Sequence, residues 1–115
     1  MLNSWDKSNE FMSEEALKKK QLELLNKTLK RAKNSEYYKK VFYNISNFSS
    51  LKELENIQFI TKDVLRDNFP YGLVAVDKSE LVRLHSSSGT TGTPTVVYYT
   101  KKDLDDWAEL ISRCM

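Results

Sequence analysis

The chain has 115 residues, of which 40% are hydrophobic and 30% are charged, and its formal net charge at pH 7 is +2. This length accommodates one domain or part of one, and the residue mixture is that of a globular protein rather than of a disordered tail. The balanced charge argues against a dedicated nucleic-acid-binding domain, for which a clustered basic face is typical.

The single cysteine, Cys114, and the single histidine, His85, exclude a disulfide framework and a Cys- or His-rich metal site within these residues. No apolar run approaches the roughly 20 residues that a membrane-spanning helix needs. We therefore expect a soluble, cytoplasmic protein with no membrane and no nucleic-acid partner. The basic residues between positions 18 and 40 form either a solvated helix face, which we prefer, or a contact for a polyanion or a membrane surface.

The first 70 residues predict a series of helices after an irregular start at residues 1–12, where Trp5, Phe11 and Met12 are candidate anchors onto another surface. Ser13 is followed by two acidic residues, which is typical of a helix N-terminus, and leucines then recur at helical spacing until a stop at Asn34. Shorter helices are expected after Ser35, after the capping box Ser50–Glu53, and over Thr61–Asn68 before Pro70.

From Tyr71 onward the pattern changes to that of strands. The apolar run Leu73–Val76, the alternating segment Glu80–His85 and the β-branched and aromatic segment Thr95–Tyr99 each predict a strand. Thr100 then begins a helix with an apolar face, on which we interpret Trp107 as a core residue. The predicted fold class is α/β, with a helical N-terminal part followed by a β–loop–β–α unit.

The segment between the last two predicted strands is the most informative part of the chain. Residues 86–92 hold two of the three glycines and five hydroxyl side chains. Glycine lets the backbone approach a ligand closely, successive N–H groups can form an anion-binding concavity, and hydroxyls donate to phosphate oxygens. The segment is not a Walker A loop, which requires G-x-x-x-x-G-K-[ST] leading into a helix. Composition alone fits either a polyphosphate cradle or a flexible Ser/Gly hairpin loop.

The order of these residues resembles a known signature. The run Ser87-Ser88-Gly89-Thr90-Thr91-Gly92-x-Pro94 is similar to the phosphate-binding signature of adenylate-forming enzymes, which include acyl-CoA synthetases. The flanks Phe59–Gly72, Val82–His85 and Pro94–Ala108 resemble the phenylacetate–CoA ligase family, so that the resemblance covers essentially the whole chain.

The resemblance implies that residues 1–115 are the N-terminal segment of a large adenylate-forming domain, with 1–70 mostly helical and 71–115 carrying strands, loop and helix. It implies that an aryl acid such as phenylacetate attacks the α-phosphate of ATP, and that coenzyme A then displaces AMP to form a thioester. Mg²⁺ offsets the phosphate charge. The implied phosphate-binding positions are Ser87, Ser88, Gly89, Thr90, Thr91 and Gly92, with no catalytic residue or metal ligand among these 115 residues.

Two departures from the family pattern leave alternatives open. Thr93 stands where the family commonly has lysine, which removes a positive charge beside the phosphates. The family's catalytic lysine and most of its acyl pocket have no counterpart in these residues, so we expect the chain alone to be inactive. The alternatives are a non-catalytic remnant that binds a nucleotide or a partner weakly, and a ligase for another aryl acid; a homodimer is also open. His85 lies either near the acyl or phosphate site or simply at a strand end, bonded to backbone.

Overall fold

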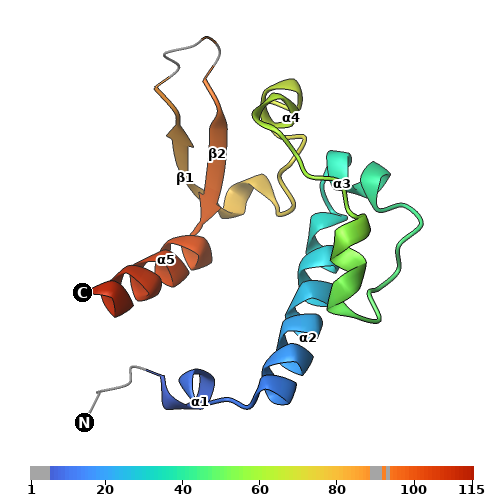
Figure 1. The fold of residues 1–115 in the computed structure, drawn as a ribbon. Helices are drawn as coiled ribbons and strands as arrows, with labels where there is room; N and C mark the ends of the chain where they lie inside the picture. Colours follow the sequence, from blue (N-terminus) through green and yellow to red (C-terminus); the bar gives the residue numbers. More distant parts are fainter. Residues whose placement is uncertain (1–5, 89–91, 93) are drawn as a thin grey trace.

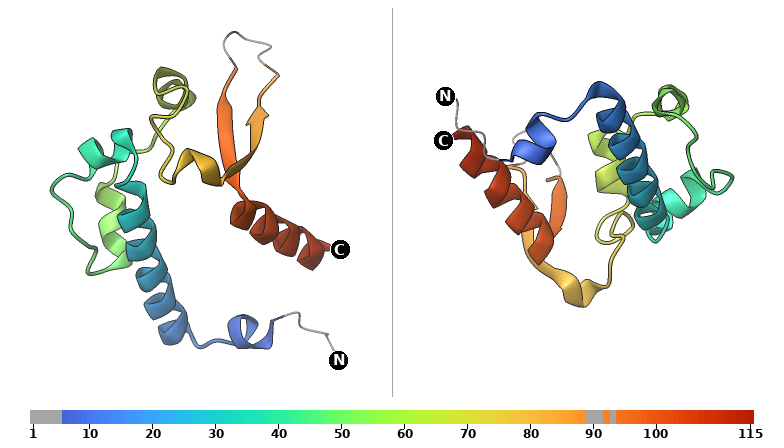
Figure 2. Two further views of the ribbon diagram at one scale, coloured as in Figure 1. Left: turned by 180° about the vertical axis from the view of Figure 1, so that it is seen from behind. Right: turned by 90° about the horizontal axis from the view of Figure 1, so that it is seen from below.

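The structure, a computed structural model, describes residues 6–88, 92 and 94–115 (Figure 1). The helices between residues 14 and 67 lie on one side and a β-hairpin with the last helix lies on the other, while the first short helix lies below the last one in Figure 1, as the views in Figure 2 also show. The presence of both helices and strands confirms the broad α/β fold class. In chain order the elements are α1 (Lys7–Glu10), α2 (Glu14–Ala32), α3 (Glu36–Val41), the 3-10 helix η1 (Leu51–Asn56), α4 (Lys62–Asp67), the 3-10 helix η2 (Lys78–Glu80), β1 (Leu81–Ser86), β2 (Val96–Thr100) and α5 (Lys101–Cys114).

The long helix α2 begins where the sequence predicted, because the Ser13 hydroxyl accepts a hydrogen bond from the Ala16 N–H at 3.2 Å. Its leucines are unequally buried. Leu29 is 3% exposed, whereas Leu17 and Leu24 remain 41% and 48% exposed. Leu22 and Leu25 pack against the same core as Leu29, so the predicted leucine stripe is buried only in part.

A small apolar core fixes α2 against the segments that follow it. Leu29, Phe42 and Phe48 are buried together, and Tyr38 stacks on Phe42 with ring centroids 5.2 Å apart. The carboxamide of Asn26 accepts from the Phe48 N–H at 2.7 Å and donates to the Phe48 carbonyl at 3.0 Å. These two bonds satisfy backbone groups of Phe48 that have no strand or helix to pair with.

The irregular start predicted for residues 1–12 is wrong for residues 7–10, which form α1. The Asp6 carboxylate caps this short helix, and hydrogen bonds from Ser8 and Asn9 lower the pKa of Asp6 to about 2. Phe11 is 75% exposed, so it joins no core among the described residues, while Trp5 lies outside them.

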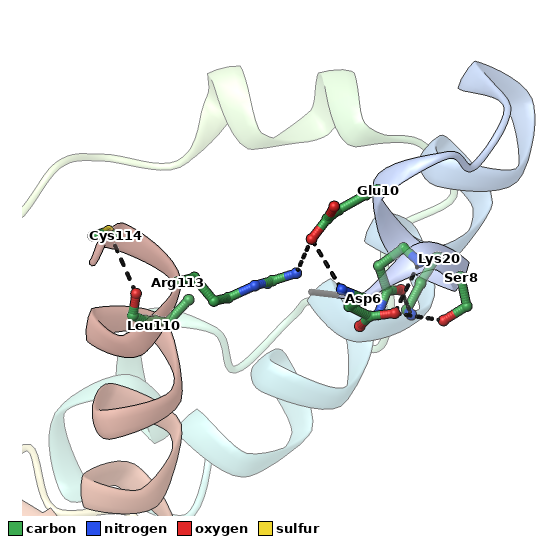
Figure 3. Close-up of polar contacts among 8 residues, drawn as sticks. Asp6, Ser8, Glu10, Lys20, Leu110, Arg113 and Cys114 are labelled. Carbon is green, nitrogen blue, oxygen red and sulfur yellow. Dashed lines mark hydrogen bonds and ion pairs between the residues drawn. The ribbon is translucent and has the colours of Figure 1, made fainter. Parts of the chain in front are cut away.

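One ion pair connects the two ends of the described chain. Arg113 of α5 reaches across to Glu10, with an Nη2–Oε1 distance of 3.0 Å, and the same Oε1 accepts from the Asp6 N–H at 3.0 Å (Figure 3). About a third of each side chain's surface is exposed, so solvent screens the pair and its contribution to stability is small.

The strand predicted over Leu73–Val76 is wrong, because backbone groups there and just before it are used in turns and by neighbouring helices. The Val74 N–H donates to the Tyr71 carbonyl at 2.9 Å, and the Gly72 carbonyl accepts from the Tyr37 N–H at 3.0 Å. A Cβ atom at Gly72 would lie 2.9 Å from the Asn68 carbonyl oxygen, so this turn requires glycine.

The hairpin pairs β1 with β2 in antiparallel register, with Leu84 opposite Tyr98 and Ser86 opposite Val96. Helix α5 follows β2 without a linker. The Thr100 hydroxyl accepts from the Asp103 N–H at 3.2 Å, and the Asp103 carboxylate accepts from the Thr100 N–H at 2.8 Å. The hydrogen bond from the Thr100 N–H lowers the pKa of Asp103 below its ordinary value. The predicted capping box is therefore confirmed.

Among the described residues, no helix combines the length and the apolar character that crossing a bilayer requires.

Removing the cap of α5 should destabilise the fold. We expect Thr100→Ala to lower the free energy of unfolding by about 1 kcal/mol, the usual effect of losing a hydroxyl N-cap. The matched control is Ser112→Ala, which removes an exposed hydroxyl that donates to the Ala108 carbonyl inside the same helix. Urea unfolding of the three proteins checks this, and an equal effect of both substitutions would contradict it.

Candidate functional site

The hydroxyl- and glycine-rich loop leaves the hairpin after its last paired residues, Ser86 and Val96. Directly beyond them, the Ser87 N–H donates to the Thr95 carbonyl at 3.0 Å. The Thr95 N–H donates to the Ser87 side-chain oxygen, Oγ, at 2.9 Å. We call this pair, Ser87 and Thr95, the neck of the loop. One of its two bonds is made by a side chain, so the regular backbone ladder ends here.

The structure describes half of the predicted phosphate-binding residues. Ser87, Ser88 and Gly92 are exposed to solvent at the open end of the hairpin. Gly92 has a φ of +131°, which side-chain-bearing residues rarely adopt, although a Cβ there would meet no atom within 4 Å. Glycine is thus required at this position by backbone conformation and not by crowding. The remaining predicted residues, Gly89, Thr90 and Thr91, lie outside the described residues, as does Thr93.

His85 belongs to an aromatic cluster under the loop. Its ring lies 4.9 Å from the Tyr99 ring and 5.7 Å from the Trp107 ring, measured between centroids, and Tyr99 stacks on Trp107 at 5.9 Å. Edge and stacked contacts at these distances are favourable. The cluster connects β1, β2 and α5. Its His85 lies one residue before Ser86, which forms the last strand pair with Val96.

Trp107 is less buried than predicted. It remains 43% exposed, and Ile111 on the same face of α5 is 51% exposed. Only the N-terminal end of α5 covers one side of the hairpin, so the apolar face predicted for α5 is partly exposed to solvent.

An apolar cavity of about 310 Å³ lies beside the other side of β2. It is bounded by residues of the 65–76 segment and of the hairpin, and Arg31 and Asp103 contribute the charges at its wall. Its lining includes Leu65, Phe69, Leu73, Val96, Val97 and Tyr98.

The described residues of the loop itself, Ser87, Ser88 and Gly92, supply hydrogen-bond donors and no acidic or basic side chain. Within the part of the chain that the structure describes, no three His, Cys, Asp or Glu side chains gather into a possible metal site. The adjacent acids Asp105 and Asp106 pair instead with Lys101 and Lys102 along α5. The exposed hydroxyls of Ser87 and Ser88 are hydrogen-bond donors of the kind that suit an anion.

The resemblance predicted from the sequence is confirmed by comparison with known proteins. Over 109 residues the chain is 44% identical to a phenylacetate-coenzyme A ligase of Pseudomonas putida, a match that covers 90% of this chain and 25% of that relative. Over 111 residues it is 40% identical to the phenylacetate-coenzyme A ligase of Escherichia coli (strain K12), covering 92% of this chain and 25% of the relative.

A third relative of the same name, from Thermus thermophilus, is 52% identical over 68 residues, which is 59% of this chain and 15% of that protein. No family model matches the chain. The chain spans about a quarter of the length of the first two relatives. A match that covers nine-tenths of the chain contains the loop between β1 and β2.

Thr95 is a residue of the site that the sequence did not predict. Its backbone forms both neck bonds, and its hydroxyl oxygen is buried with no hydrogen-bond partner among the described residues. Only its position opposite Ser87 in the hairpin could have identified Thr95 as a site residue. That position depends on the strand register, which the composition of the sequence does not determine.

The buried hydroxyl of Thr95 gives a direct test of the neck geometry. We expect Thr95→Val to leave the free energy of unfolding unchanged or to raise it by up to about 1 kcal/mol, because a buried hydroxyl without a partner is costly. The backbone bonds to Ser87 do not need the side chain. Thermal or urea unfolding checks this, and a clear loss of stability would mean that the hydroxyl has a partner.

Proposed function

We propose that this chain is the N-terminal part of an ATP-dependent, AMP-forming ligase of the phenylacetate–CoA ligase type. The observation that carries the proposal is the 40–44% identity to proteins of that name over nine-tenths of the chain. The position of the hydroxyl–glycine loop, at the end of a hairpin with its serines exposed, supports it.

In the proposed reaction, the carboxylate of an aryl acid such as phenylacetate attacks the α-phosphate of ATP and pyrophosphate leaves. The thiol of coenzyme A then attacks the acyl carbon, and AMP leaves as the thioester forms. The role proposed for this chain is to bind and orient the β- and γ-phosphates, which is a positioning and charge-stabilising role.

The exposed hydroxyls of Ser87 and Ser88 would donate to phosphate oxygens. Gly92 would allow a backbone turn that brings main-chain N–H groups toward the phosphates. Gly89, Thr90 and Thr91 enter the proposal through the resemblance alone. Among the described residues no cluster of acidic side chains could hold Mg²⁺, and the proposal names none of them as its ligand.

The test is phenylacetate-dependent exchange of labelled pyrophosphate into ATP. We expect the protein made from the complete reading frame that contains this segment to catalyse the exchange, and the 115-residue chain to be inactive. Exchange that depends on another aryl acid would keep the ligase class and change the substrate. No exchange with any acid would contradict the proposal and favour the non-catalytic alternative.

Gly92 gives a sharper test within the complete protein. We expect Gly92→Ala to raise the KM for ATP about tenfold or more, because an alanine at a φ of +131° strains the backbone by roughly 1–3 kcal/mol. The control is Ser112→Ala, an exposed residue of α5 outside the proposed phosphate-binding set whose hydroxyl bonds only within its own helix. Unchanged ATP kinetics in the Gly92 variant would count against the assignment of this loop.

A further inference from the structure

The backbone of β1 is bonded to a neighbouring strand on one side only. At the neck, the Ser87 N–H donates to the carbonyl of Thr95, the residue opposite it, at 3.0 Å. Along an antiparallel pair of strands, residues that exchange backbone bonds alternate with residues whose N–H and C=O groups point away from the partner. The register places His85 opposite Val97, two residues further along, so these two form the next bonded pair.

By the same alternation, the N–H and C=O groups of Leu84 and Ser86 point away from β2. We call these four backbone groups the outer edge of β1. No hydrogen bond is made to any of them within the part of the chain that the structure describes. A hairpin of two strands is only marginally stable by itself, and unpaired edge groups of this kind are a template for another strand.

The other edge of the hairpin, along β2, faces the rest of the chain. The Thr100 N–H on that edge donates to the Asp103 carboxylate at 2.8 Å. The apolar cavity beside β2 is lined by Val96 and Tyr98 together with Leu65 of the preceding segment. Figures 1 and 2 likewise show β1 on the side of the hairpin away from α4. The open edge is therefore that of β1.

The sequence of β1 leaves this edge unprotected. Native edge strands commonly carry a lysine, a proline or a bulge that prevents further pairing. Residues 81–86 contain neither lysine nor proline, and their single arginine, Arg83, lies at the irregularity in register that begins at Leu81, before the outer edge. The side chains of Val82 and Leu84 are more than half exposed, so apolar surface accompanies the unpaired backbone groups.

We propose that the outer edge of β1 pairs with a further β-strand, supplied by the part of the complete protein that lies beyond residue 115. The inference rests on the proposed function for that part, because this chain spans about a quarter of the length of the ligases it resembles. A strand in the same polypeptide has a high effective concentration, which favours it over a second copy of the chain. The edge selects an extended segment with free backbone groups and an apolar side chain beside Leu84.

Amide hydrogen exchange of the complete protein tests the pairing. We expect the Leu84 and Ser86 amides to be protected there like the amides of His85 and Val97, which bond within the hairpin and serve as internal controls. In the 115-residue chain, Leu84 and Ser86 should exchange at least about tenfold faster than in the complete protein, since each lacks one hydrogen bond. Fast exchange at Leu84 and Ser86 beside a protected His85 in the complete protein would overturn the proposal.

Nuclear Overhauser contacts of the complete protein identify the occupant of the edge. We expect the Leu84 amide proton to lie close to an amide proton of a residue beyond position 115. Slow exchange without such a contact would mean that a helix or a loop covers the edge, and would overturn the strand. Contacts between differently labelled copies in a mixed sample would assign the edge to a dimer and overturn the proposed occupant. A complete protein that shows the pairing but catalyses no pyrophosphate exchange would overturn the proposed function alone.

Discussion

The antiparallel pairing of β1 with β2 is the constraint on which the candidate site depends. Because Ser86 lies opposite Val96, the next residues along each strand, Ser87 and Thr95, meet across the neck. The loop therefore begins and ends at one point on a hydrogen-bonded base. In the proposed function, this base would hold the two ends of the loop that presents hydroxyl and backbone donors to the phosphates.

The same pairing joins the loop to the last helix. Helix α5 follows β2 directly, and the Thr100–Asp103 cap defines its first turn. Trp107 extends from that helix to the rings of His85 and Tyr99 on the two strands. Sheet, helix and neck therefore form a continuous unit, whereas α2, α3 and the segment that ends at Ile57 surround a separate core at Leu29, Phe42 and Phe48.

Much apolar surface remains exposed outside that core. Phe59 is 96% exposed, and Val82, Leu84 and Leu110 are each more than half exposed. Exposed apolar surface of this extent commonly marks an interface with other protein surface. Together with a chain that spans a quarter of its relatives' length, it supports the proposal that these residues form part of a larger domain.

Local signals in the sequence predicted most of the helices and both strands of the hairpin. The caps at Ser13, Ser35 and Thr100 were predictable because a cap depends only on residues within one turn. The apolar run Leu73–Val76 was misleading because neighbouring turns and helices use the backbone groups there. α1 escaped prediction because its four residues carry too little periodicity.

The candidate site was predictable only in part. The order of hydroxyl and glycine residues indicated a phosphate-binding loop, because that chemistry depends on side-chain type and spacing. The neck was not predictable, since the bond from the Thr95 N–H to Ser87 depends on strand register. The exposure of Trp107 likewise depends on what covers α5, which no local pattern records.

The most direct test of the central claim is the nucleotide sequence that follows codon 115 in its native genomic context. We expect an open reading frame that continues for about three times the length of this chain, as the length of the relatives implies, and that encodes the remainder of an adenylate-forming domain. A stop codon directly after Met115 would contradict the claim, because this polypeptide would then lack the residues that the ligase reaction requires.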